Sequence, residues 1–228
     1  MHTLLLSLCL PLLACSCGHS ARQTSLTQTQ VHEQTIAAHS AQAPNRDVAF
    51  LRDSVIYTKA DSSKVVSLLK ETPQGSDVIF YARRFIGIPY VASTLEVADP
   101  ERLVVNLRQL DCTTLVETVL ALTMTKRQCA TDFSTYCRNL MLLRYRNGQM
   151  NGYLSRLHYF TWWMHDNIDM GLVREVSDTK HFTSPMIVNN YYMSAHPASY
   201  KFLKAHPEWA DSIAQMEKEH AGRDGYYL

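Results

Sequence analysis

The feature that most constrains the fold is an apolar stretch that follows Asp111. Its large side chains recur at helical spacing and occupy nearly every face of the predicted helix; they are Leu115, Val116, Val119, Leu120, Leu122 and Met124. A helix that is apolar on all sides has to be covered by other elements. Asp111 can accept hydrogen bonds from the first turn, so we expect the helix to begin directly after it. The chain is therefore predicted to pack around a buried central helix.

Shorter patterns on either side predict the elements that cover this helix. Ser62 can cap a helix that stops at 72–73, and Ser76 or Asp77 can cap a second one that ends at Gly87. The apolar face of the second helix would comprise Val78, Ile79, Ala82, Phe85 and Ile86. Further helices are expected at 132–145, 159–167, 199–205 and 208–221, the last entered through Pro207, and short strands at 55–57, 103–107 and 186–188.

The N-terminal residues resemble an export signal. Residues 3–14 form an apolar run that is too short for a stable membrane anchor. It ends in Leu12, Leu13 and Ala14 before Cys15, which is the pattern of a bacterial lipoprotein signal with Cys15 as the lipidated residue. A plain cleaved signal peptide is the alternative. We expect a signal peptide over 1–17 and a secreted, periplasmic or membrane-anchored protein, with membrane contact only through the lipid.

Composition divides the rest of the chain and excludes some partners. Residues 18–45 are polar and contain almost no large apolar side chains, which predicts a flexible tether, and 46–228 is expected to be one domain. The 22 basic and 21 acidic residues give a formal net charge of +1. This balance provides no general attraction for nucleic acid, so no nucleic-acid partner is expected.

Cysteine positions single out one residue. Of the six cysteines, three lie in the leader and three in the body, namely Cys112, Cys129 and Cys137. Cys129 and Cys137 can be a disulfide pair or two buried small side chains. Cys112 stands at the start of the central helix, where unpaired N–H groups and the helix dipole stabilise a thiolate and an oxyanion. This position alone is weak evidence, because inert buried cysteines are commoner.

The surrounding motifs strengthen the argument. The stretch Leu110–Glu117 (Leu-Asp-Cys-Thr-Thr-Leu-Val-Glu) resembles the nucleophile motif of the NlpC-type papain-like cell-wall hydrolases, and Arg84–Tyr90 resembles their Gly-x-Pro-Tyr element. Ala92–Glu96 and Ser155–Tyr159 are similar to one branch, the N-acetylmuramoyl-L-alanine amidase-like family. The resemblance runs from about residue 75 to the end of the sequence.

The resemblance implies an α+β papain-like fold and amide hydrolysis on peptidoglycan fragments (muropeptides), at the bond between N-acetylmuramic acid and L-alanine, without metal or cofactor. Cys112 would be the nucleophile, Tyr90 would line the cleft, and Asp111 would position the first turn or bind substrate. Arg156, His158 and Tyr159 would lie on the substrate side. An endopeptidase that cuts between D-Glu and the diamino acid of the stem peptide is an alternative.

The sequence departs from the family pattern at the general base. The family carries its catalytic histidine in a His-Val-Gly strand, and none of the histidines after Cys112 is followed by Val-Gly. The last residues, 222–228, read as a Gly-rich turn and the start of an aromatic strand. We therefore expect the helical lobe to be largely present, the antiparallel sheet to be truncated, and turnover to be impaired. A non-catalytic muropeptide-binding lipoprotein and a non-functional remnant remain alternatives.

Overall fold

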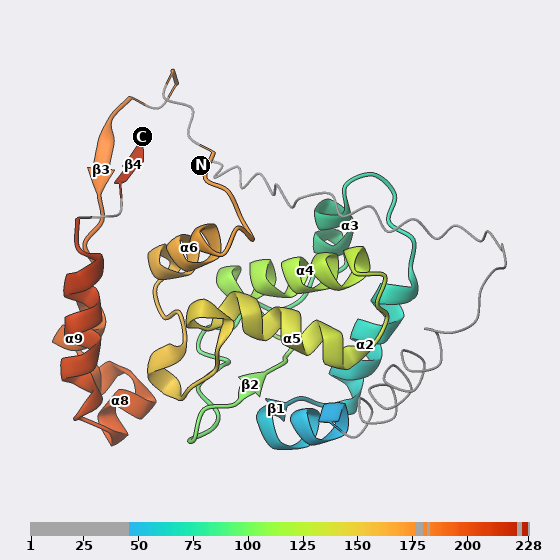
Figure 1. The fold of residues 1–228 in the computed structure, drawn as a ribbon, viewed down its shortest axis with the longest axis horizontal. Helices are drawn as coiled ribbons and strands as arrows, with labels where there is room; N and C mark the ends of the chain where they lie inside the picture. The colour runs from blue at the N-terminus through green and yellow to red at the C-terminus, as the bar shows by residue number, and fades with distance from the viewer. Residues whose placement is uncertain (1–45, 177–179, 182, 223–224, 228) are drawn as a thin grey trace, which may run out of the picture.

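The computed structural model describes residues 46–176, 180–181, 183–222 and 225–227, and it is mainly helical (Figure 1). Residues 46–54 are helical. The helices that follow are α2 (Lys59–Lys70), α3 (Asp77–Arg83), α4 (Cys112–Arg127), α5 (Phe133–Arg144), α6 (Phe160–Asp169), α7 (Tyr192–Ala195), α8 (Lys201–Ala205) and α9 (Trp209–His220). Short 3-10 turns are η1 (Arg146–Gly148), η2 (Tyr153–Ser155) and η3 (Pro197–Ser199).

Two small sheets accompany these helices within the described residues. Strand β1 (Val55–Ile56) pairs in parallel with β2 (Leu103–Val104). Strand β3 (Pro185–Ile187) pairs antiparallel with β4 (Gly225–Tyr227), with Met186 opposite Tyr226. The prediction of a mixed fold with a small sheet is confirmed, while its papain-like arrangement stays a prediction. None of the described helices combines the length and hydropathy that crossing a membrane requires.

The central helix was predicted correctly. In α4 every side chain from Glu117 to Thr125 is buried, and the helix lies beside α5 in the middle of the molecule (Figure 1). Two buried threonine hydroxyls form hydrogen bonds within the helix. Thr123 donates to the Val119 carbonyl at 2.9 Å, and Thr125 donates to the Ala121 carbonyl at 2.7 Å. Such internal bonding lets polar residues occupy an otherwise apolar environment.

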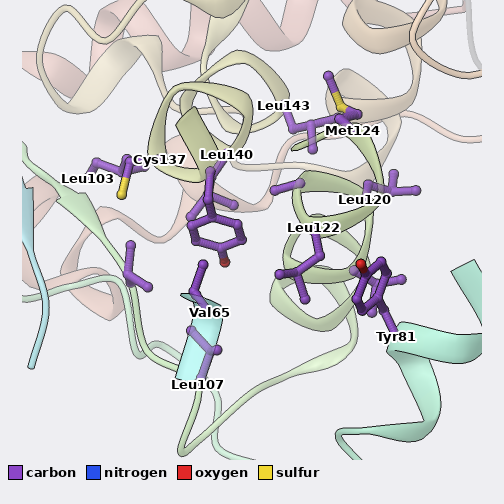
Figure 2. Packing of buried hydrophobic residues seen from close by; sticks show 14 of the residues in the cluster. Val65, Tyr81, Leu103, Leu107, Leu120, Leu122, Met124, Cys137, Leu140 and Leu143 are labelled. Carbon is purple, nitrogen blue, oxygen red and sulfur yellow. The ribbon is translucent and has the colours of Figure 1, made fainter. Parts of the chain in front are cut away.

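The main core lies where α4 and α5 meet the preceding helices. Figure 2 shows Val65 of α2, Tyr81 of α3, Leu122 of α4 and Leu140 of α5 in this cluster. All four side chains are almost fully buried, and Leu107, just after β2, closes the cluster on one side. This packing positions the start of α4, because the helix that carries Cys112 is anchored along its length.

Three local predictions in the helices before α4 need correction. Helix α2 begins at Lys59 and is capped by Thr58, not Ser62, because Thr58 and Asp61 form a reciprocal capping box. Helix α3 ends at Arg83, before Gly87. Its expected apolar face is also wrong in part: Ile79 and Ile86 are 52% and 81% exposed, whereas Tyr81 is fully buried in the core.

The C-terminal helices form a second, smaller layer around a separate cluster. It consists of Tyr153, Met193, Phe202, Leu203 and Ile213. Helices α8 and α9 confirm the two predicted late helices, although α9 is capped by Glu208 and Pro207 precedes the cap. Helix α7 was not predicted. In Figure 1 this layer lies to one side of the α4–α5 pair.

The N-terminal predictions cannot be compared with the fold. The signal peptide, Cys15 and the tether over 18–45 all lie outside the described residues. The strand expected at 55–57, which lies within the described residues, is present as the two-residue strand β1 and follows the helical residues 46–54.

Candidate active site

Cys112 is the first residue of α4 and is exposed to solvent. The start of the helix is capped by Asp111 and Thr114, with no contribution from the Cys112 side chain. The Asp111 carboxylate accepts a hydrogen bond from the Thr114 amide at 2.8 Å, and the Thr114 hydroxyl accepts one from the Asp111 amide at 2.9 Å. The Cys112 sulfur lies 4.0 Å from the Thr113 hydroxyl. The thiol thus stands open at the positive end of a well-capped helix, which is a suitable position for a nucleophile.

Backbone hydrogen bonds bring the second motif to this helix start. The Val91 amide donates to the Leu110 carbonyl at 3.1 Å, and the Leu110 amide donates to the Pro89 carbonyl at 3.2 Å. They form a parallel bridge between Tyr90 and Leu110, so that Tyr90 lies beside Cys112 with 71% of its surface exposed. The pKa of the Tyr90 phenol is raised, first by the negative charge of an ionised Cys112 and further by Asp111. The Asp111, Cys112 and Tyr90 side chains therefore form one exposed site.

Arg156 lies in the interior. Its guanidinium pairs with the Glu96 carboxylate, lies 3.5 Å from the Glu101 carboxylate, and donates to the Leu95 carbonyl at 3.2 Å. The side chains of Arg156 and Glu101 are only 5% and 2% exposed. Arg156 also stacks over the Tyr153 ring at 4.9 Å. These partners are all internal, so direct contact with substrate stays a prediction that this geometry does not favour.

His158 and Tyr159 are also engaged by internal partners. His158 Nε2 lies 2.9 Å from the Tyr153 carbonyl, which can only accept, so this nitrogen carries the proton. Burial, followed by the charge of Arg156, lowers the pKa of His158 well below its usual value, and the ring is neutral near pH 7. The Tyr159 hydroxyl donates to Glu217 at 2.6 Å and accepts from the Met193 amide at 2.8 Å.

The structure thus brings together three of the six predicted site residues. Within the described parts of the chain, no histidine nitrogen is a hydrogen-bond partner of Cys112, and no group of His, Cys, Asp or Glu is arranged to hold a metal ion. Cys129 is exposed and Cys137 buried, and both are free thiols rather than a disulfide. Sequence reasoning missed Glu101, which has no motif to mark it, whereas Glu96 lay in the stretch already noted as family-like.

Comparison with known proteins identifies the family of the chain. The model of the AmiA-like family, described as N-acetylmuramoyl-L-alanine amidase-like, matches residues 81–221 and so includes both motifs. A search of curated proteins found no match.

Solved structures of proteins similar to this chain include two amidases. An N-acetylmuramoyl-L-alanine amidase from Bacteroides uniformis is 36% identical over 66% of this chain and 62% of its own, with a TM-score of 0.58. A second B. uniformis amidase structure is 32% identical over 67% and 65%, with a TM-score of 0.57. A candidate xylanase from Bacteroides fragilis is 37% identical over 64% and 63%, with a TM-score of 0.59. This chain therefore spans less than two thirds of the length of these proteins. With more than half of its residues matched by the family model, the chain belongs to the AmiA-like, N-acetylmuramoyl-L-alanine amidase-like family.

Proposed function

We propose that the chain acts on peptidoglycan fragments as a cell-wall amidase with Cys112 as its nucleophile. The observation that carries this proposal is the position of Cys112, exposed at the capped start of α4 with Tyr90 beside it. Family membership supports an amidase-like function on the bacterial cell wall. The substrate bond is the amide between the lactyl group of N-acetylmuramic acid and L-alanine.

The chemistry follows from groups at the helix start. The Cys112 thiolate attacks the lactyl carbonyl carbon, and the N–H groups of the first turn of α4 are placed to stabilise the oxyanion. The C–N bond then breaks, the L-alanine amine leaves with a proton, and water hydrolyses the thioester to regenerate the thiol. Tyr90 would line the cleft, and Asp111 would keep the first turn in place through its bonds with Thr114.

We further propose that turnover is impaired in this chain. The leaving amine needs a proton donor and the attacking water needs a base, a pair of tasks that a histidine performs in such sites. No described histidine is a hydrogen-bond partner of Cys112, and His158 is held by the Tyr153 carbonyl. This geometry equally favours a second candidate, a non-catalytic lipoprotein that binds muropeptides through the Cys112 and Tyr90 site. In both cases we propose export and a lipid anchor on Cys15.

Product analysis distinguishes these functions. A disaccharide-peptide from peptidoglycan is incubated with the wild-type chain, with Cys112→Ala and with Cys129→Ala, and the products are identified by mass spectrometry. Cys129→Ala is the matched control, because among the described residues it removes the second exposed thiol, which lies outside the site. The amidase proposal requires slow release of the intact stem peptide by the wild type and the control only.

Other results point elsewhere. Fragments cut after D-Glu assign the chain to endopeptidases. Saturable binding without any product supports the binding lipoprotein. If Cys112→Ala releases stem peptide as fast as the wild type, Cys112 is not the nucleophile.

A further inference from the structure

The buried charges around Arg156 connect two segments that are far apart in the sequence. The guanidinium bonds to the Leu95 carbonyl, 61 positions earlier, and pairs with Glu96 and Glu101. Residues 91–101 therefore form a loop whose middle and C-terminal end are tied to one cation. A second tie comes from α8, where the Lys201 ammonium donates to the Glu96 carbonyl at 3.2 Å.

This loop joins Tyr90 to β2 and lies against the start of α4. Thr94 and Leu95 share the lining of a small cavity of ≈ 10 Å³ with Thr114 and Thr118 of α4. Thr114 is the residue that closes the capping box beside Cys112. The loop thus has Tyr90 at one end and packs against the helix start that carries the nucleophile.

We propose that Arg156 is a positioning residue: together with Glu96 and Glu101 it clamps the 91–101 loop as the wall of the Cys112 site. This proposal rests on the proposed function only for its effect on muropeptides. Arg156 acts through the loop, from the interior, and not by contact with substrate. Its place in the Ser155–Tyr159 motif is then explained by the loop that it holds rather than by a sugar that it binds.

Two variants loosen the clamp in different ways. Arg156→Lys keeps the charge, but a single ammonium cannot reach the Leu95 carbonyl and both carboxylates with the geometry of a guanidinium. Lys201→Ala removes the outer tie from the protein surface, so it leaves no buried charge unpaired and keeps the test open if Arg156→Lys does not fold. Lys204→Ala on the same helix is the matched control, since Lys204 is exposed and, among the described residues, its side chain makes no hydrogen bond to the loop.

The first measurement is hydrogen exchange of the loop amides. The Glu96 and Val97 amides donate to the Ser93 and Leu95 carbonyls at 3.3 and 2.9 Å, so exchange reports how often the loop opens. Loss of one hydrogen bond to a charged group predicts about tenfold faster exchange at these amides and at Thr114 in both variants. Exchange in α5 should be unchanged, as should all exchange in Lys204→Ala.

The second measurement is the dissociation constant of a disaccharide-peptide muropeptide, determined by calorimetry on the same chains. The clamp proposal expects severalfold weaker binding by both loosened variants and wild-type affinity for the control. Unchanged loop exchange overturns the clamp, whatever the ligand does. Faster loop exchange with unchanged affinity overturns the positioning role. A wild-type chain that binds no muropeptide counts against the proposed function instead, and the exchange data still decide the clamp.

Discussion

The ion pair between Glu117 and Arg144 supports the start of α4 from within, and its removal gives the sharpest stability prediction. The two side chains are 3% and 4% exposed and 2.8 Å apart. Arg144 also donates to the Val104 carbonyl at 2.6 Å, which joins α5 to β2. Arg144→Met keeps most of the side-chain volume but leaves the Glu117 carboxylate and the Val104 carbonyl without their donor.

The magnitude follows from these contacts. Breaking one partner of a buried pair costs about 3–5 kcal/mol of unfolding free energy, because an uncompensated charge remains inside. The double variant Glu117→Leu with Arg144→Met removes both charges. Only the Val104 carbonyl then lacks its donor, which should lower the free energy of unfolding by about 1–3 kcal/mol. The double variant should therefore be more stable than Arg144→Met alone. For a chain of this size, the single variant should lower the melting temperature by roughly 10 °C.

Urea unfolding followed by circular dichroism measures both differences. Arg138→Met is the control on the same helix, because Arg138 is 45% exposed and forms a surface ion pair with Asp47, expected to contribute at most about 1 kcal/mol. If Arg144→Met costs no more than the control, the pair does not support the core. If the double variant is less stable than Arg144→Met, the penalty does not come from an unpaired buried charge.

Three further predictions concern Asp61, His206 and Leu122. Burial alone would raise the pKa of Asp61, but hydrogen bonds, including one from the Leu107 amide at 3.0 Å, hold it below its usual value. Asp61→Asn should lower the free energy of unfolding by about 1–3 kcal/mol at pH 7, measured by urea unfolding. The difference in unfolding free energy between wild type and variant should shrink below about pH 4, where the carboxyl of the unfolded chain is protonated. A difference that stays constant with pH would contradict this. His206 lies 2.6 Å from Asp99, and this hydrogen bond raises its pKa. The stabilising effect of the His206–Asp99 pair should be complete below about pH 6 and should disappear as the pH rises through the raised pKa of His206. The melting temperatures of wild type and His206→Gln should therefore converge in alkaline buffer. Leu122 is fully buried, and Leu122→Ala should cost about 2–5 kcal/mol by urea unfolding, whereas a cost under about 1 kcal/mol would refute its central place in the core.

Local patterns predicted much of this protein because they act over a few residues. The apolar run after Asp111 identified the buried helix, and the capping residue placed its first turn correctly. The same logic placed the start of α3. It failed at α2, where both Thr58 and Ser62 are chemically able to cap, and only the reciprocal bond with Asp61 decides between them.

The site was predictable in part for the same reason. Cys112 and Tyr90 carry recognisable motifs, and their proximity is produced by backbone bonds between Pro89, Val91 and Leu110. The interior role of Arg156 could not be predicted. A guanidinium in a motif is compatible with substrate or with carboxylates, and the choice depends on which charges folding brings to it.

By itself, the sequence determined the central helix, its cap and the thiol at its first residue, since these depend on neighbours within one or two turns. Only the tertiary structure decided that Tyr90 stands beside Cys112, and that Arg156 is enclosed by Glu96 and Glu101 from a loop about 60 positions away. The physical reason is that a buried charge needs a partner, and long-range packing, not local pattern, determines which partner is within reach.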